Sequence, residues 1–184
     1  YGISLDGNTG VCMDNIGLRG SSGTFFGKMD YGHTLKMFNT LDPHLVILQF
    51  GGNPMPYIKD QSGVDRYVRY FAAQLARLKK MRPNTAFVVI GPSDMSMKYK
   101  DKYITYPYLP FVRDGLKKAA FAAGMGYWDM YEAMGGYNSM PSWVMAEPAL
   151  AGPDYVHFTP KGSKVVANMF YNALMLEYTR YNKR

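Results

Sequence analysis

The chain has 184 residues, of which 47% are hydrophobic and 19% charged, and its formal net charge is +7 at pH 7. This length and apolar content are typical of one globular domain that buries a sizeable core, so we expect residues 1–184 to form a single domain. No apolar run reaches about 18 residues, so the sequence predicts no membrane span. The single cysteine, Cys12, excludes an internal disulfide bond and a cysteine-based metal cluster.

The positive charge is compatible with an anionic partner, such as a nucleic acid, an acidic glycan or a cell wall. The basic residues are dispersed along the chain, and Lys79 and Lys80 close a predicted helix, where cations interact favourably with the helix dipole. We therefore expect no nucleic-acid partner. His33, His44 and His157 lack the close spacing of metal ligands, so we expect neither a structural metal nor a cofactor.

In chain order, residues 10–16 predict a first strand, in which we expect Cys12 to pack. A glycine-rich block follows at residues 16–23, and its backbone amides can point at an anion. Residues 43–50 form a continuous apolar run, which is typical of a strand buried on both faces of a parallel sheet. Two glycines then allow a sharp exit, and the amide of Asn53 follows them at the strand end where α/β sheets bind ligands.

The middle of the chain alternates between helical and strand patterns. Apolar residues at helical spacing cover residues 64–78, a strand pattern follows at 85–90, a second helix is expected over 111–123, and a short strand over 125–130. Right-handed crossovers place the helices of such a chain on both faces of a parallel sheet. The sequence therefore predicts an α/β fold, a three-layer α/β/α sandwich whose first strand is missing from this chain.

Two further segments carry aromatic residues. Residues 98–110 are expected to form a long loop near the strand ends, with four tyrosines that can stack on sugars. For any one of these tyrosines, core packing or loop anchoring is the favoured role. Residues 135–153 are expected to be irregular. We expect this second segment, which carries Pro141 and Trp143, to lie over the site as a substrate wall.

Residues 154–157 read Asp-Tyr-Val-His and stand directly before a strong helix start. The Thr159 hydroxyl can cap that helix, Pro160 suits its first position, and an apolar stripe follows. A carboxylate beside a histidine fixes the ring tautomer and stabilises the imidazolium that forms during proton transfer. Asp154 and His157 are therefore candidates for acid–base catalysis, with the alternative that they only tie down a turn.

Three of these blocks, in this order, resemble the SGNH (GDSL-like) hydrolase superfamily, whose name lists serine, glycine, asparagine and histidine from four separated blocks. Gly20 matches the glycine block, Asn53 the Gly-x-Asn block, and residues 154–157 the Asp-x-x-His block. The resemblance implies that the Gly20 backbone N–H and the Asn53 side-chain amide form an oxyanion hole. It also implies that Asp154 and His157 complete a Ser-His-Asp triad.

A narrower resemblance concerns bacterial carbohydrate esterases, including peptidoglycan O-acetylesterase-like proteins. It is carried by residues 91–95, which read Gly-Pro-Ser-Asp-Met after a strand, and by Trp143 upstream of Asp154. This resemblance implies an O-acylated carbohydrate or a small ester as substrate. It also favours a periplasmic or secreted location.

The serine block of that superfamily has no assignable counterpart, so the nucleophile is unidentified. Too few residues precede Ser4 for a strand that could present it, Ser21 and Ser22 are expected to cap a helix, and Ser93 is expected to be a loop residue. We expect the chain to be the C-terminal part of a longer protein. A preceding N-terminal segment of that protein would then supply the serine.

The expected function is a serine-type esterase that removes acetyl or other small acyl groups from a carbohydrate or related ester. An O-acyltransferase, in which a sugar hydroxyl replaces the attacking water, is the chemical alternative. A catalytically inactive module that binds a glycan or a partner is an alternative of a different class.

Overall fold

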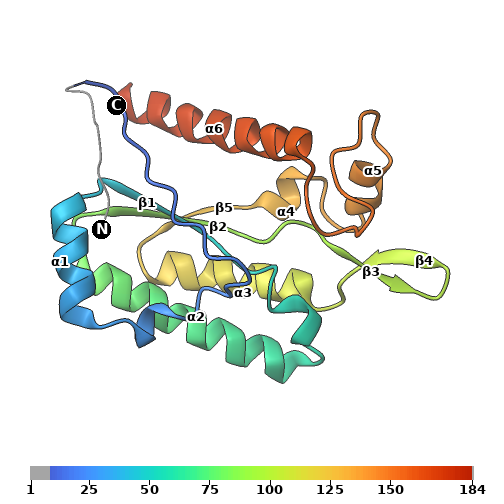
Figure 1. Ribbon diagram of the computed structural model, residues 1–184, viewed down its shortest axis with the longest axis horizontal. Helices are drawn as coiled ribbons and strands as arrows, with labels where there is room; N and C mark the ends of the chain where they lie inside the picture. The colour runs from blue at the N-terminus through green and yellow to red at the C-terminus, as the bar shows by residue number, and fades with distance from the viewer. Residues whose placement is uncertain (1–8, 184) are drawn as a thin grey trace.

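The computed structural model describes residues 9–183, and a parallel sheet lies at its centre (Figure 1). The sheet contains β1 (Leu45–Gln49), β2 (Ala86–Ile90) and β5 (Gly126–Trp128) in the order β1-β2-β5. The register pairs Leu45 with Ala86 at one end of β1 and Gln49 with Ile90 at the other. All three strands run in the same direction, so their carboxyl ends meet at one edge of the sheet.

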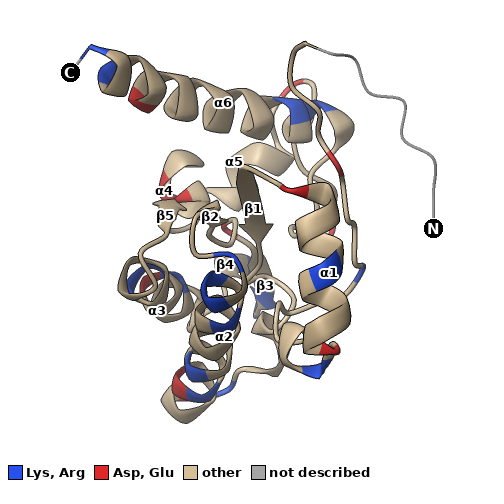
Figure 2. Ribbon diagram, turned by 90° about the vertical axis from the view of Figure 1, so that its left-hand side faces the viewer, with Lys and Arg blue, Asp and Glu red and all other residues tan. Residues whose placement is uncertain are grey.

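Figures 1 and 2 show α6 on one face of the sheet and α2 and α3 on the other, which confirms the expected three-layer α/β/α sandwich. Within the described part of the chain, no helix is long and apolar enough to cross a membrane. The remaining elements have the following bounds: η1 (Phe26–Lys28), α1 (Tyr31–Leu41), η2 (Met55–Tyr57), α2 (Gln61–Met81), β3 (Ser96–Tyr99), β4 (Lys102–Thr105), α3 (Leu109–Ala122), α4 (Met130–Ala133), α5 (Met140–Val144) and α6 (Pro160–Asn182).

The main core lies between α2, α3 and the sheet. Asp60 caps α2 by accepting a hydrogen bond of 2.7 Å from the Gly63 backbone N–H, and apolar residues then recur at helical spacing on the buried face. This face packs against β2 and α3 through side chains that are all buried: Val64, Phe71, Leu75, Leu78, Phe87, Val89, Val112 and Leu116. The sheet is thereby held at its centre, and its carboxyl edge is left to the connecting loops.

The N-terminal strand prediction is wrong. Residues 10–16 form no strand, and the side chains of Val11, Met13 and Ile16 are 98%, 82% and 78% exposed. Cys12 is exposed as well and does not pack in a strand. A strand needs a partner strand to pair with its backbone groups, and no strand of residues 9–183 pairs with this segment.

β1 forms where the sequence predicts it, but it is not buried on both faces. Leu48 is buried, whereas Leu45 and Ile47 are 38% and 42% exposed. The reason is its place in the sheet, because β1 is an edge strand whose single described neighbour is β2. The Ser4 prediction lies outside the described residues.

Two segments expected to be irregular are ordered elements instead. Within the expected loop 98–110, β3 and β4 pair as an antiparallel hairpin that turns at Lys100, where φ is +54°. Within residues 135–153, α5 forms, no residue of this segment lines the cavity at the carboxyl edge of the sheet, and Trp143 lies in the core. Its side chain is buried because the indole N–H finds a partner, the Met134 carbonyl oxygen, at 3.0 Å.

We predict that Gly115→Ala destabilises the protein by about 1–3 kcal/mol. A Cβ at Gly115 in α3 would lie 2.4 Å from Val68 Cγ2 in α2, and a β-branched valine has little freedom to move away. The control is Gly32→Ala in α1, where the new Cβ would meet Asp30 Oδ1 at an ordinary 3.6 Å. Urea unfolding should show a lower free energy of unfolding for Gly115→Ala and a free energy about 0.5–1 kcal/mol higher for Gly32→Ala. Equal stability of Gly115→Ala and the wild type would contradict this packing argument.

Candidate active site

The loops that leave the carboxyl ends of β1 and β2 meet the segment before α6 around a cavity of about 230 Å³. Asn53 follows β1, Ser93 follows β2, and His157 precedes α6, so three distant parts of the sequence share one wall. Open α/β sheets bind their ligands at this edge. The complete lining is Gln49, Phe50, Gly51, Gly52, Asn53, Gly91, Pro92, Ser93, Met95, Met130, Val156, His157 and Phe158.

Asp154 and His157 are in direct contact. His157 Nδ1 lies 2.8 Å from Asp154 Oδ2, and Asp154 Oδ1 accepts hydrogen bonds of 3.0 Å from the backbone N–H groups of Val156 and His157. The side chains of His157 and Asp154 are 80% and 52% exposed. The carboxylate thus orients the ring while the ring stays open to solvent, which is the arrangement a histidine base requires.

The environment of Asp154 favours its charged form. Partial burial acts to raise the pKa of this carboxyl, but hydrogen bonds from the His157 backbone, the His157 ring and the Val156 backbone outweigh burial, and the net pKa is lowered from 3.8. The side chain is therefore an anion at neutral pH. An anion at this position holds the Nδ1–H tautomer and leaves Nε2 free to accept a proton.

The loop that carries this pair is fixed on three sides. The Gly152 backbone N–H donates to the His157 carbonyl oxygen at 2.8 Å, and the Ser96 N–H of β3 donates to the Tyr155 carbonyl oxygen at 2.9 Å. The Tyr155 ring stacks on Tyr103 of β4, with centroids 3.6 Å apart and planes 6° from parallel. Tyr155 adopts a left-handed φ of +58°, a conformation that these contacts maintain.

The start of α6 also holds the loop that carries Asp154 and His157 in place. Thr159 Oγ1 accepts from the Gly162 N–H at 3.1 Å and donates to the Ala149 carbonyl oxygen at 2.8 Å, so one hydroxyl caps the helix and ties down the chain before the loop. Gly162 passes so close to Leu150 that a Cβ there would lie 1.8 Å from its carbonyl oxygen. The helix cap predicted from the sequence is thus also a positional constraint on His157.

Asn53 reaches the cavity through a turn that needs glycine. Gly51 has φ of +114°, and a Cβ there would meet Leu116 Cδ1 at 2.9 Å. Asn53 Nδ2 donates a hydrogen bond of 2.8 Å to the Ser21 carbonyl oxygen. An amide nitrogen carries two hydrogens, so this bond fixes the side chain and still leaves a second N–H as a donor.

Gly20 lies beside this bond but does not line the cavity. It is exposed and has φ of +71°, and Ser21, the next residue, is the one that contacts Asn53. The structure therefore brings His157 and Asn53 to one cavity, with Asp154 bonded to the His157 ring and Gly20 beside the Asn53 bond. The oxyanion-hole role of Gly20 stays a prediction.

The cap predicted for Ser21 and Ser22 is wrong, because the next helix, η1, begins only at Phe26 and Phe25 is its N-cap. Ser21 Oγ instead accepts from the Gly23 N–H at 3.2 Å. Ser93 lies in the loop after β2, as predicted, and it also lines the cavity.

Sequence reasoning missed Asp94, which is 0% exposed. Its Oδ1 accepts from Thr105 Oγ1 at 2.7 Å, and its Oδ2 accepts from the Met140 N–H at 2.7 Å. Asn138 closes the network by exchanging hydrogen bonds of 2.8 and 2.9 Å with Thr105. The signal available was an acid four residues after an apolar strand, since a carboxylate near a strand end is either at a site or in a buried network.

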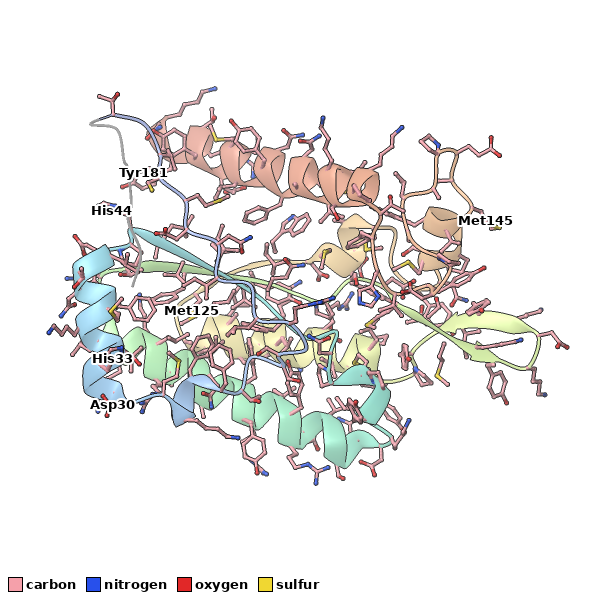
Figure 3. All side chains as sticks on the ribbon, in the orientation of Figure 1. Asp30, His33, His44, Met125, Met145 and Tyr181 are labelled. Carbon is pink, nitrogen blue, oxygen red and sulfur yellow. The ribbon has the colours of Figure 1, made fainter. Side chains whose placement is uncertain are left out.

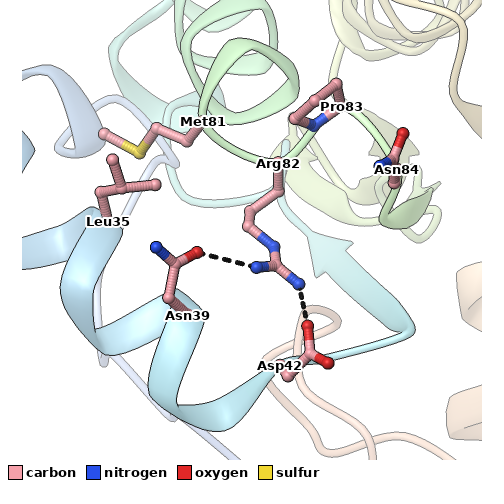
Figure 4. Close-up of a pocket in the computed structure, with 7 residues that line it drawn as sticks. All are labelled: Leu35, Asn39, Asp42, Met81, Arg82, Pro83 and Asn84. Atoms are coloured by element: carbon pink, nitrogen blue, oxygen red, sulfur yellow. Dashed lines mark hydrogen bonds and ion pairs between the residues drawn. The ribbon is translucent and has the colours of Figure 1, made fainter.

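A larger cavity, of about 450 Å³, lies at the other edge of the sheet between α1 and the end of α2 (Figure 4). Three of its polar side chains bind one another, because Arg82 donates to Asn39 Oδ1 at 2.8 Å and forms an ion pair with Asp42. Figure 3 places His33 and His44 at this same α1 end of the molecule. Among residues 9–183, no group of three or more histidine, cysteine or acidic residues is placed to hold a metal ion.

No protein-family model matches the sequence, and no curated protein matches it. Solved structures match its fold. A peptidoglycan O-acetylesterase superposes with a TM-score of 0.76 and 22% identity, over 88% of this chain and 45% of its own. A putative GDSL-like lipase from Parabacteroides merdae ATCC 43184 superposes with a TM-score of 0.54 and 19% identity, over 77% of this chain and 66% of its own.

A third match is the periplasmic domain of a lipopolysaccharide acetyltransferase from Salmonella ser. Paratyphi A, with a TM-score of 0.51 and 15% identity, over 78% of this chain and 61% of its own. The chain thus spans less than half the length of the O-acetylesterase. These matches show that the chain shares the fold of these proteins, as the sequence resemblance predicts.

We predict that Asp154→Asn makes the protein less stable at about pH 6 and that this difference shrinks toward about pH 2.5. Because the pKa of Asp154 is lowered on folding, its stabilising contribution is present above 3.8 and is lost as the pH falls through the folded value. Thermal unfolding at both pH values measures the effect. The control is Asp101→Asn in the β3–β4 turn, an exposed residue outside every described ion pair; a pH-independent difference for Asp154→Asn would contradict the prediction.

Proposed function

We propose that this domain catalyses acyl transfer from an O-acyl ester to water, removing acetyl or another small acyl group from a carbohydrate or related ester. The observation that carries the proposal is the 2.8 Å contact between His157 and Asp154 on a cavity that Asn53 also lines. The fold likeness to a peptidoglycan O-acetylesterase supports the choice of substrate class. The acid–base pair, the amide donor and the fold all suit the same chemistry.

In the proposed reaction, His157 Nε2 accepts the proton of a serine hydroxyl as its oxygen bonds to the ester carbonyl carbon. Asp154 stabilises the imidazolium that forms. The negative charge on the carbonyl oxygen is met by the free N–H of Asn53 and by the Gly20 N–H. The ester C–O bond then breaks, the alcohol leaves with the proton from His157, and a water activated by the same nitrogen releases the acid.

We place the serine nucleophile on a segment outside the described residues, seated along the free edge of β1. Three observations support this place. β1 has one described neighbour, its Leu45 and Ile47 side chains are partly exposed, and the apolar side chains of Val11 and Ile16 lie uncovered in the preceding segment. A parallel strand between β1 and residues 10–16 would pair the free edge and cover these side chains.

An O-acyltransferase is the second candidate. The likeness to the periplasmic domain of a lipopolysaccharide acetyltransferase favours it, because the same residues serve whether water or a sugar hydroxyl attacks the acyl-enzyme. Supplying an acetyl ester together with a sugar acceptor separates the two reactions. Acetate as the only product supports the hydrolase, and acetylated sugar supports the transferase.

In the full-length protein, we predict that His157→Ala removes nearly all activity on small acetyl esters and that Asn53→Ala lowers turnover by about 100- to 1000-fold. The first change removes the base, and the second removes one donor to the transition-state charge. His44→Ala is the control, because this exposed histidine lies at the α1 end of the molecule (Figure 3). Unaltered turnover of Asn53→Ala would remove the amide from the mechanism.

An active-site-directed fluorophosphonate locates the nucleophile. We predict that the full-length protein is labelled at a serine outside residues 9–183 and that His157→Ala labels much more slowly, because the hydroxyl is then no longer deprotonated. Peptide mass spectrometry identifies the labelled residue. Labelling at Ser21, Ser22 or Ser93 would show that the nucleophile belongs to the described residues, and no labelling of an active esterase would exclude a serine mechanism.

A further inference from the structure

We propose that the β3–β4 hairpin is a binding arm for an acidic glycan, and that it guides a carboxylate-bearing sugar chain toward the cavity. This inference rests on the proposed function, because it extends the substrate from an acyl ester to the polymer that bears it. It is carried by the charge, the position and the anchoring of the hairpin.

The hairpin is a concentration of positive charge. Residues 98–102 contain Lys98, Lys100 and Lys102 against one acid, Asp101, so the local net charge is +2 (three lysines minus one aspartate). All three lysines are exposed, and none forms an ion pair with another described residue. Lys100 Nζ lies 5.6 Å from the centroid of the Tyr99 ring, and no described acidic side chain neutralises the three ammonium groups of this short hairpin. An anionic partner would relieve the repulsion among them.

Each face of the hairpin pairs a lysine with a tyrosine. The register sets Lys98 opposite Tyr103 and Tyr99 opposite Lys102, so each pair shares one face. The Tyr99 ring is 56% exposed and Tyr103 is 36% exposed. An exposed ring beside an ammonium group suits a sugar with a carboxylate, because the ring contacts the apolar side of the sugar while the ammonium binds its charge.

The hairpin projects from the body of the protein, yet its base belongs to the wall of the cavity (Figure 1). Met95, which lines the cavity, directly precedes β3, and the Tyr103 ring stacks on Tyr155 in the loop that carries His157. A chain bound along Lys98 and Tyr103 would therefore run toward the histidine. The arm extends the site outward from the reacting group.

The base is also rigid, which a binding arm requires. A two-stranded hairpin is marginally stable by itself, and this one is fixed by the Asp94 network through Thr105 and by the bond from the Ser96 N–H to the Tyr155 carbonyl oxygen. The lysines are thereby presented at a set distance from the cavity. Little entropy is lost when a ligand binds to a surface ordered in advance.

The test measures binding by the full-length protein with isothermal titration calorimetry, using alginate oligosaccharides as the acidic probe and dextran of equal length as the neutral one. We expect binding to alginate that weakens as sodium chloride rises from about 50 to about 300 mM, and no binding to dextran. The Lys98→Glu/Lys102→Glu variant should bind alginate about 10-fold or more weakly. Lys36→Glu/Lys118→Glu, an equal change in net charge at exposed sites on α1 and α3, should bind as the wild type does.

Equal weakening in both double variants, salt-independent binding or equal affinity for dextran would overturn the proposal. So would tighter binding to an oligothymidylate of the same charge, since that would make the partner a nucleic acid. The salt titration uses unaltered protein, and Lys98→Gln/Lys102→Gln provides a milder variant if charge reversal disturbs folding. Small-ester hydrolysis is measured in parallel: alginate binding without hydrolysis would overturn the proposed function alone, and hydrolysis without preference for alginate would overturn the arm alone.

Discussion

The buried carboxylate of Asp94 is the constraint on which one side of the candidate site depends. A carboxylate without solvent is costly unless it is fully hydrogen-bonded, so its partners must stay in place for the fold to be stable. Those partners are Thr105 at the end of β4 and the Met140 N–H at the start of α5, while Asp94 itself follows the cavity residue Ser93. One side chain thereby joins the end of β2, the hairpin and the segment before the loop that carries His157.

The hairpin connects the Asp94 network to the loop that carries His157. Tyr155 is held by the Ser96 N–H of β3 and by the Tyr103 ring of β4, and it stands between Asp154 and His157 in the chain. The acid–base pair is therefore positioned by a two-stranded sheet outside the central sheet, together with the cap of α6. A substitution at Asp94 would therefore change the position of His157 through β4 and Tyr155, although Asp94 and His157 belong to different segments.

Local patterns account for the parts of the structure that the sequence predicts. The helices α2, α3 and α6 follow from apolar spacing and caps, and the Asp154–His157 contact follows because residues three apart in a turn are neighbours whatever the rest of the fold does. Strand pairing is not local. Residues 10–16 have strand-like composition and form no strand, because pairing depends on a neighbour that the segment itself does not specify.

The hairpin was missed for a related reason. The sequence around its turn, residues 98–103, alternates lysine and tyrosine almost throughout and lacks the apolar face by which a strand is recognised. This pattern therefore predicts a loop over residues 98–110. Its stability comes from contacts with Asp94 and Tyr155 that lie far away in sequence. The segment 135–153 differs in the opposite sense, because it is predicted to lie over the site and packs in the fold instead. The buried Trp143 side chain, with its indole N–H bonded inside the protein, has a packing role.

The two halves of the site therefore differ in how firmly they are held. The acid–base half is fixed by the Asp94 network, the hairpin and α6, whereas the glycine block beside Asn53 is attached through the Asn53 bond to Ser21, the Tyr67 hydroxyl bond to the Ser22 carbonyl oxygen, and the packing of Gly23 against the Phe50 ring. Stability varies within a fold in this way, and segments with few buried contacts open most easily. A strand seated on the free edge of β1 would contribute where the contacts are fewest. The geometry around Asn53 and the glycine block therefore depends more on what binds that edge than the geometry around Asp154 and His157 does.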